Sequence, residues 1–318
     1  MRNLKNSRIL VFGASGQVGS ELLCQLQKFN CKITALKKSK WKVYDNDNVK
    51  YKNINLNTIE DKKLSSLIND HNFIFYLAGD TSVSVLPHCE LKYYLSWFKP
   101  LQKILTLMIK TKKVLIYASS VTVFGSKLVL PATTEKSESP ETSYDLAKCS
   151  CDNLIKYYRY NYNVNCVSLR FSNIYGPNTS QGNSHRRVLN KILDNIHLKK
   201  EITIVGDGFY NRNYLHVYDA AAMMIHALIH FSNTPAILIA CSKQNLMFKD
   251  IIGILVDVYK NFFKAHVKIK YGLKPRFKTD ERNFSAQPSV FFKKNFKYKY
   301  NLREGFKEMI KDLQKKII

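Results

Sequence analysis

A glycine-rich turn near the start of the chain limits the fold more than any other feature. The apolar run Ile9-Leu-Val-Phe is followed by Gly13, Gly16 and Gly19 at GxxGxxG spacing, and then by a helical pattern. In such a unit the glycines allow a tight turn, close approach to a pyrophosphate and close packing of helix on strand. The helix N-terminus offers N–H groups to the phosphates. We therefore predict a dinucleotide-binding loop with contacts from Gly13, Ser15, Gly16, Gln17, Val18 and Gly19.

Apolar runs and helical patterns alternate along the chain, which is typical of a parallel sheet covered on both faces. Strands are expected at 9–12, 32–36, 49–56, 73–77, 114–118, 164–170 and 236–240. Helices are expected at 21–29, 91–110, 144–162, 219–230 and 301–318, with a polar helix ending at 68. We predict an α/β fold, a Rossmann doubly wound parallel sheet with a smaller C-terminal α/β substrate-binding lobe. The Rossmann domain is expected over 1–170 with 217–245 returning to it, and the lobe over 171–216 and 246–318.

Composition excludes several classes of protein. At 318 residues and 45% hydrophobic content the chain can bury a large core. No segment approaches the roughly 20 apolar residues of a membrane span, and a basic leader runs straight into the first strand, so we expect a cytoplasmic protein. The seven cysteines have no metal-ligand spacing and are expected to be reduced thiols, with no metal bound. The net charge of +26 comes from lysines spread along the chain. We expect it to attract polyanionic ligands rather than nucleic acid.

The choice between NAD and NADP depends on the end of the second strand. An acidic residue there accepts hydrogen bonds from the adenosine ribose and selects NAD. This chain has Lys37 at that position, 24 residues after Gly13, and then Lys38. A cation favours the 2′-phosphate of NADP, although a lysine without any role is the alternative in so lysine-rich a chain. Further cofactor contacts are expected from Asn55, Leu56, Leu77, Ala78 and Gly79.

A tyrosine and a lysine four residues apart form the candidate catalytic pair. Tyr144 and Lys148 share one face of a predicted helix. A nearby ammonium lowers the pKa of a phenol, as a general acid/base for an alcohol requires. The pattern alone is weak, but Ala118-Ser-Ser120-Val-Thr-Val-Phe-Gly125 places hydroxyls at a strand end 24 residues upstream.

Taken together, these motifs resemble the extended short-chain dehydrogenase/reductases, and within them the nucleotide-sugar epimerase and dehydratase family. GxxGxxG, Leu77-Ala-Gly79, SSxxVFG, YxxxK, the segment 169–177 and the segment 206–217 occur in the family's order. The resemblance implies that Tyr144 is the acid/base towards a sugar hydroxyl or carbonyl, and that Lys148 holds the nicotinamide ribose and lowers the tyrosine pKa. Ser120 would hydrogen-bond the reacting oxygen, with Ser119 as the alternative if the alignment slips by one.

The resemblance also implies a site for a nucleotide-diphosphate sugar. Asn173 and the loop after it match the wall around the diphosphate, and Val188 is a further candidate contact. Arg212 and Arg276 match two arginines that grip diphosphate oxygens; for each of them the alternative is a surface ion pair. Arg186 and Arg187 are weaker candidates.

The chain departs from the family at several positions. Asn55 stands where an aspartate is usual, and Trp97 replaces an asparagine in the helix before the fifth strand, with Pro100 three residues later. Trp97 and Pro100 are expected to reshape that helix near the active site. Val121 and Thr122 stand where the dehydratases have an acidic pair, so 4,6-dehydration is not expected.

Three functions remain open. The first is an NAD(P)-dependent nucleotide-sugar epimerase, acting at C4 through a 4-keto intermediate. The second is an NADPH-dependent reductase of 4-keto-deoxysugar nucleotides for polysaccharide synthesis, which Lys37 favours. The third, which the intact Ser120, Tyr144 and Lys148 set argues against, is a non-catalytic dinucleotide-binding sensor. Resemblance further suggests a homodimer through the helix from Tyr144, which carries Leu154, Ile155, Tyr157 and Tyr158.

Overall fold

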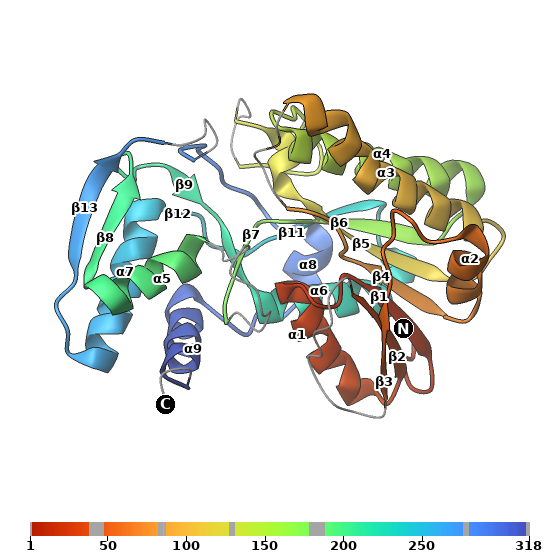
Figure 1. Ribbon diagram of the computed structural model, residues 1–318, viewed down its shortest axis with the longest axis horizontal. Coiled ribbons are helices and arrows are strands. Elements are labelled where there is room, and N and C mark those ends of the chain that lie inside the picture. The colour runs from red at the N-terminus through yellow and green to blue at the C-terminus, as the bar shows by residue number, and fades with distance from the viewer. Residues whose placement is uncertain are drawn as a thin grey trace.

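A single parallel sheet forms the centre of the molecule (Figure 1). The computed structural model describes residues 2–37, 48–81, 85, 87–126, 131–177, 188–275 and 280–315. The order of the seven strands is β11-β6-β5-β4-β1-β2-β3, and every neighbouring pair is parallel. The strands are β1 (Arg8–Phe12), β2 (Lys32–Lys37), β3 (Val49–Asn53), β4 (Phe73–Tyr76), β5 (Val114–Ser120), β6 (Cys166–Phe171) and β11 (Ile237–Ala240).

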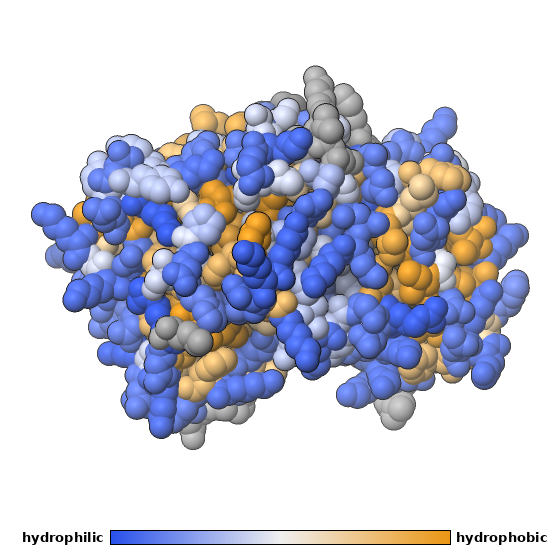
Figure 2. Space-filling view, turned by 180° about the vertical axis from the view of Figure 1, so that it is seen from behind, coloured by the Kyte–Doolittle hydropathy of each residue, from blue (hydrophilic) through white to orange (hydrophobic). Residues whose placement is uncertain are grey.

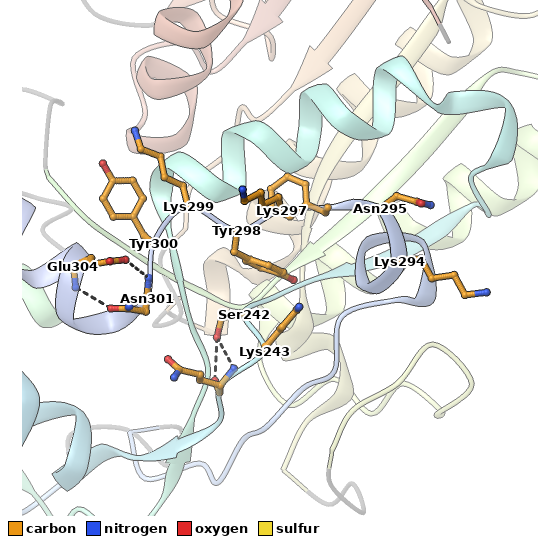
Figure 3. Close-up of a pocket in the computed structure, with 12 residues that line it drawn as sticks. Ser242, Lys243, Lys294, Asn295, Lys297, Tyr298, Lys299, Tyr300, Asn301 and Glu304 are labelled. Carbon is orange, nitrogen blue, oxygen red and sulfur yellow. Dashed lines mark hydrogen bonds between the residues drawn. The ribbon is translucent and has the colours of Figure 1, made fainter.

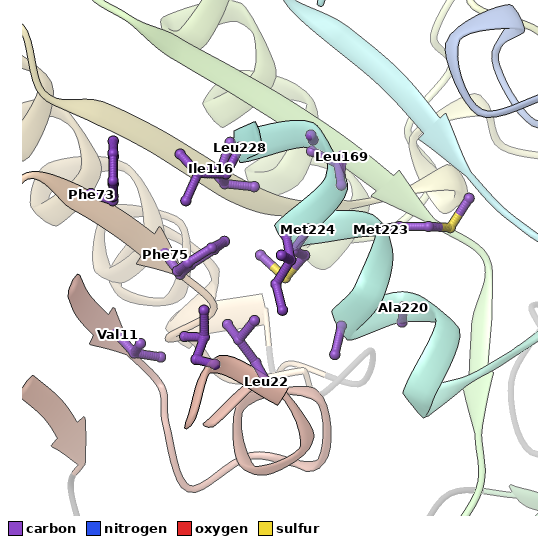
Figure 4. Packing of buried hydrophobic residues seen from close by; sticks show 14 of the residues in the cluster. Val11, Leu22, Phe73, Phe75, Ile116, Leu169, Ala220, Met223, Met224 and Leu228 are labelled. Atoms are coloured by element: carbon purple, nitrogen blue, oxygen red, sulfur yellow. The ribbon is translucent and has the colours of Figure 1, made fainter. Parts of the chain in front are cut away.

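Helices cover both faces of the sheet because alternate strand residues point to opposite sides. Ile9 and Val11 of β1 pack towards α1 (Gln17–Leu26) and α6 (Val217–Ile229), as Figure 4 shows for part of this cluster. Leu10 and Phe12 pack on the other side. The helices on that side are α2 (Asp61–Asn69), α3 (Glu90–Leu107) and α4 (Ser143–Tyr162). The predicted Rossmann doubly wound sheet is confirmed.

A further hydrophobic cluster forms a second lobe beside the sheet, at the left in Figure 1. It packs α5 (Val188–Lys199), α7 (Phe248–Phe263) and α9 (Leu302–Lys315) around the parallel pair β8 (Glu201–Val205) and β13 (Lys268–Leu273). Two short pairs link this lobe to the sheet: β7 (Asn173–Tyr175) with β10 (Tyr214–His216), and β9 (Asn211–Arg212) with β12 (Leu246–Met247). The remaining elements are α8 (Val290–Asn295) and the short 3₁₀ helices Gln27–Phe29, Pro87–Cys89, Val121–Phe124 and Phe231–Asn233.

The structure differs from the sequence-based expectations at a few boundaries. The first helix begins at Gln17 rather than at residue 21, directly behind the glycine turn, and β3 ends at Asn53. The helix α3 continues through Pro100. Phe292 of α8 falls in a segment assigned to the second lobe, yet it is fully buried in the cluster of α1 and α6. Helix α8 therefore packs on the Rossmann side.

The expected dimer face of α4 is wrong for two residues. Ile155 and Tyr158 are 0% and 8% exposed, and the Tyr158 hydroxyl lies 2.8 Å from Thr106 Oγ1 on α3. Together with Cys151 they follow the helical period towards the core. Tyr157, at 50% exposure, does lie on the surface.

A buried ion network fixes α4 against β6. Arg170 is 1% exposed, and its Nε lies 2.7 Å from Asp152 Oδ2 on α4. The Ser168 hydroxyl donates to the other oxygen of Asp152 at 2.5 Å, and Glu138 binds the Arg170 Nη2 at 2.5 Å. Because each buried charge has a partner, the network holds the helix in register with the sheet.

Two general properties follow from the described residues. All seven cysteines have free thiols. In the described ranges, no helix combines the length and the apolar character that crossing a membrane requires.

The histidine on α6 gives the first prediction. His226 lies among Phe291, Phe292 and Phe296, and burial, followed by His230, lowers its pKa from 6.5 to about 4. As the pH falls below 6.5 the unfolded chain takes up this proton and the folded chain does not, so the free energy of unfolding falls towards pH 4. Between pH 6.5 and pH 4, the free energy of unfolding of His226→Leu, measured with urea, should fall by about 1–2 kcal/mol less than that of the parent. Equal losses in the two proteins would contradict the assignment.

Candidate active site

The glycine turn after β1 packs tightly against the turn after β4. Gly13 has φ +79°, and a Cβ there would lie 2.6 Å from the backbone of Leu77 and Ala78. A Cβ at Gly19 would overlap the carbonyl oxygen of Gly13, so α1 sits directly on the turn. Gly16, in contrast, is exposed, and a Cβ there would be no closer than 3.4 Å to Gly13 O. Two of the glycines therefore serve packing, and the third leaves space for a ligand.

The N-terminus of α1 is suited to bind a pyrophosphate. Gly16 is its N-cap residue, and no side chain caps the helix, so the backbone N–H groups of its first turn are oriented for an anion. Ser15 is half-buried beside this turn, and Val18 packs into the core below it. Gln17 points elsewhere: its Nε2 donates to the carbonyl oxygens of Gly176 and Pro177 at 3.2 and 3.3 Å. These residues fit the diphosphate of a dinucleotide.

Lys37 lies at the end of β2, as predicted, but it is largely buried. Its residue exposure is 8%, and its Nζ lies 5.2 Å from the centroid of the Tyr51 ring on β3. Asn55 is exposed and its Oδ1 accepts a hydrogen bond from Asn57 N–H, while Leu56 is half-buried. Lys38 lies outside the described residues.

The turn after β4 brings the dinucleotide loop close to α3. Gly79 has φ +153°, and a Cβ there would overlap the indole ring of Trp97. Trp97 is 2% exposed, and its ring contacts that of Tyr144 edge-on with a centroid distance of 5.9 Å. The residue that departs from the family pattern thus lies between a predicted cofactor contact and a predicted catalytic residue.

The ammonium of Lys148 is buried between α4, β5 and α3. It donates to Ala118 O at 2.5 Å and to the Tyr117 hydroxyl at 3.2 Å, and it lies 3.9 Å from the Trp97 ring centroid. Its distance to the Tyr144 ring centroid is 5.8 Å. Burial lowers the pKa of Lys148 to about 8, and the charges of Cys151 and Asp152 oppose the shift.

The two candidate serines at the end of β5 have different environments. Ser120 accepts the Thr122 N–H at 3.3 Å and lies 3.0 Å from Thr122 Oγ1. Ser119 is buried, and its hydroxyl has no hydrogen-bond partner within the described part of the chain. Since Lys148 binds Ala118 O, the catalytic helix is attached to β5 beside both serines.

The residues predicted to contact the substrate diphosphate do not form one cluster as the predicted catalytic residues do. Arg212 is already engaged, because its guanidinium donates to the carbonyl oxygens of Asn211, Asp280 and Arg282. Asn173 is half-buried at the start of β7, and Val188 is 56% exposed at the start of α5. Arg186, Arg187 and Arg276 lie outside the described residues.

Arg282 is a residue near the site that sequence reasoning missed. Its Nη2 lies 2.9 Å from Glu141 Oε2 and 3.1 Å from Asp145 Oδ2, next to Tyr144. Asp145 also closes a capping box with Thr142 at the start of α4. No sequence pattern marks Arg282, because the contact joins residues 137 positions apart. Arg282 therefore forms a charged clamp between the segment around residue 282 and the start of the catalytic helix.

A hollow of about 630 Å³ lies away from these residues (Figure 3). Its lining contains Ser242, Lys243, Gln244, Lys294, Asn295, Phe296, Lys297, Tyr298, Lys299, Tyr300, Asn301 and Glu304. None of the predicted site residues is among them. Four of its lining residues are lysines, in a chain whose net charge is +26. Hydrophilic side chains also cover most of the face of the molecule seen in Figure 2.

Metal ligation receives no support within the described ranges, where no group of His, Cys, Asp and Glu side chains could hold an ion. The groups that the structure does bring together beside the dinucleotide loop are a phenol and an ammonium.

Comparison with known proteins agrees with this arrangement. The model of the NAD dependent epimerase/dehydratase family matches residues 9–240. The chain belongs to this family, which confirms the resemblance inferred from its motifs. The family's members are enzymes that use NAD.

Individual relatives are distant in sequence but similar in fold. A putative UDP-glucose 4-epimerase of Methanocaldococcus jannaschii is 26% identical over 224 residues, 69% of this chain and 73% of that protein. The UDP-N-acetylglucosamine 4-epimerase of Methanobrevibacter ruminantium has TM-score 0.85 and 22% identity, covering 98% of this chain and 99% of that chain. The UDP-glucuronic acid 4-epimerase of Bacillus cereus, solved with UDP-glucuronic acid and NAD, has TM-score 0.79 and 18% identity, covering 97% and 99%. Among the curated relatives, the match covers as little as 30% of one protein's own length and as much as 89% of another's.

The packing of the glycine turn gives the second prediction. Gly13→Ala forces a side chain into a positive φ and onto the β4 turn, which should cost on the order of 2–4 kcal/mol of stability and remove NAD binding. Gly253→Ala, on α7 with nothing within 4 Å, is the matched control and should gain about 0.5–1 kcal/mol. Urea unfolding and calorimetric NAD titration measure both effects. Unchanged NAD affinity in Gly13→Ala would refute the loop assignment.

Proposed function

We propose that this protein is an NAD-dependent 4-epimerase of a nucleotide-diphosphate sugar. The observation that carries the proposal is the meeting of Lys148, Tyr144 and the end of β5 beside the glycine turn. Membership of the family and the fold shared with several 4-epimerases support it.

Each residue has a task in the proposed reaction. Tyr144 takes the proton from the sugar C4 hydroxyl and gives it back after the 4-keto sugar has rotated to present its opposite face. Ser120, at the end of β5, hydrogen-bonds the same oxygen. Lys148 holds the nicotinamide ribose, and its positive charge favours the phenolate of Tyr144. The chemistry that NAD supplies when bound is the reversible acceptance of a hydride from C4.

Dehydration of the sugar is disfavoured by the surroundings of Ser120. Val121 and Thr122 follow it in place of an acidic pair, and the Thr122 hydroxyl lies 3.0 Å from the Ser120 Oγ. The nearby carboxylates Glu141 and Asp145 are paired with Arg282. Neither is therefore a base that is ready to remove a sugar proton.

The remaining alternative is the NADPH-dependent reductase, which rests on Lys37. Burial of Lys37 over Tyr51 favours a packing role for this lysine, and with it NAD as the resident cofactor. The free cysteines fit a reducing compartment, and we place the reaction in the cytoplasm.

The third prediction tests cofactor and reaction together. Protein purified without added nucleotide and then denatured should release close to one NAD per chain, identified by mass spectrometry. The native protein should convert UDP-glucose to UDP-galactose, or UDP-N-acetylglucosamine to its C4 epimer, without added dinucleotide. Tyr144→Phe should lower turnover by about 10²–10⁴-fold while keeping its NAD.

Other outcomes distinguish the alternatives. An empty site that prefers NADPH and reduces 4-keto sugars would replace epimerase by reductase, and Lys37→Ala should then weaken NADPH binding but not NADH binding. Unchanged turnover in Tyr144→Phe would remove the proposed mechanism. If neither dinucleotide binds, the proposal fails as a whole.

We also propose that the protein is a homodimer through the outer faces of α3 and α4. The exposed apolar side chains there include Leu91 at 70%, Leu146 at 49%, Tyr157 at 50% and Tyr160 at 69%. Residues 146, 157 and 160 recur with the helical period and form one stripe.

The fourth prediction concerns this stripe. Charges in a dimer interface are costly when buried without a partner, so the double substitution Tyr157→Glu and Tyr160→Glu should convert a dimer into a monomer in sedimentation analysis. Tyr271→Glu, at an exposed tyrosine of the second lobe, should leave the dimer intact. A parent protein that sediments as a monomer would refute the assembly.

A further inference from the structure

The indole of Trp97 is the least expected part of the site. It projects from α3 and is 2% exposed. One side of it meets the Gly79 backbone, where even a Cβ would overlap the ring, and its edge contact with Tyr144 has a centroid distance of 5.9 Å. The ring thus fills the space between the turn after β4 and the catalytic helix.

The Lys148 ammonium lies closer to this ring than to the rings of Tyr117 and Tyr144. The centroid distances are 3.9 Å to Trp97, 4.7 Å to Tyr117 and 5.8 Å to Tyr144. A cation over an indole face is attracted by the ring quadrupole, and the attraction grows when water is excluded. Lys148 is 5% exposed, so this condition is met.

The ammonium has few other sources of compensation. It donates to Ala118 O and to the Tyr117 hydroxyl, which leaves one of its three N–H groups for a ligand. The nearby carboxylate of Asp152 is already paired with Arg170 and Ser168. Burial lowers the pKa of Lys148 to about 8, so the charged form is only moderately favoured at neutral pH.

We propose that Trp97 is a positioning residue that holds the Lys148 ammonium by a cation–π contact in the place where it binds the nicotinamide ribose. The indole face is the contact that α3 makes with the ammonium, and it keeps the charge beside Tyr144. The inference rests on the proposed role of Lys148 in binding a dinucleotide, and its first test needs neither cofactor nor substrate.

The fifth prediction uses the fluorescence of Trp97 itself. The chain has two tryptophans, so Trp41→Phe makes Trp97 the only emitter. Its emission, measured on protein stripped of dinucleotide, should change between pH 6.5 and 9.5 with a midpoint near 8, where Lys148 loses its charge. The change should vanish when Lys148→Met is added and persist when Tyr144→Phe is added.

The other groups around the ammonium do not explain such a transition. Burial raises the pKa of Cys151 to about 11 and the pKa values of Tyr117 and Tyr93 further still. Asp152 remains paired, and the Tyr144→Phe control removes the phenol in contact with the indole. Emission that does not vary with pH, or a transition that survives Lys148→Met, would overturn the pairing.

A binding experiment then tests the positioning role. In calorimetry, Trp97→Leu should weaken NAD by about tenfold and leave ADP unchanged, because ADP lacks the nicotinamide ribose. Trp97→Phe keeps an aromatic face and should restore most of the NAD affinity. A loss shared equally by NAD and ADP, or equal affinities in the Leu and Phe variants, would show a merely structural role. If the parent protein binds neither ligand, the proposed function fails while the fluorescence result still decides the Trp97–Lys148 contact.

Discussion

The central strands of the sheet are covered by helices on both faces, and the site depends on this arrangement. Helical crossovers between parallel strands make all carboxyl ends meet at one edge. The turns after β1, β4 and β5 therefore lie together, although Gly13, Gly79 and Ser120 are far apart in sequence. The close backbone contact between the first two turns leaves room for nothing larger than glycine, and the third delivers the hydroxyl.

The parts of this arrangement that are local in sequence were predictable. The glycine turn, the pairing of Tyr144 with Lys148 on one helix and the alternation of strands and helices all follow from short-range periodicity. The Rossmann fold and the family were confirmed. The roles of Ser120, Tyr144 and Lys148 stay predictions that the geometry supports.

Contacts between distant segments were not predictable, because no spacing rule connects them. The sequence marks Trp97 only as a departure from the family pattern, and its contact with Lys148 results from the packing of α3 against α4. Arg212 matches a motif, yet its guanidinium binds the backbone carbonyls of Asp280 and Arg282. An apolar side chain on a helix does not reveal which face of the helix is covered, and for this reason the expectation of Ile155 at the surface is wrong.

The side chain of Arg282 gives the segment 280–282 a mechanical connection to the catalytic helix. Arg212 on β9 binds the carbonyl oxygens of Asp280 and Arg282, and Arg282 pairs with Glu141 and Asp145 at the start of α4. Tyr144 is the neighbour of Asp145 in the same turn. Displacing the segment 280–282 would therefore either break these ion pairs or pull on the turn that carries the phenol, so the position of this segment and the alignment of Tyr144 are coupled.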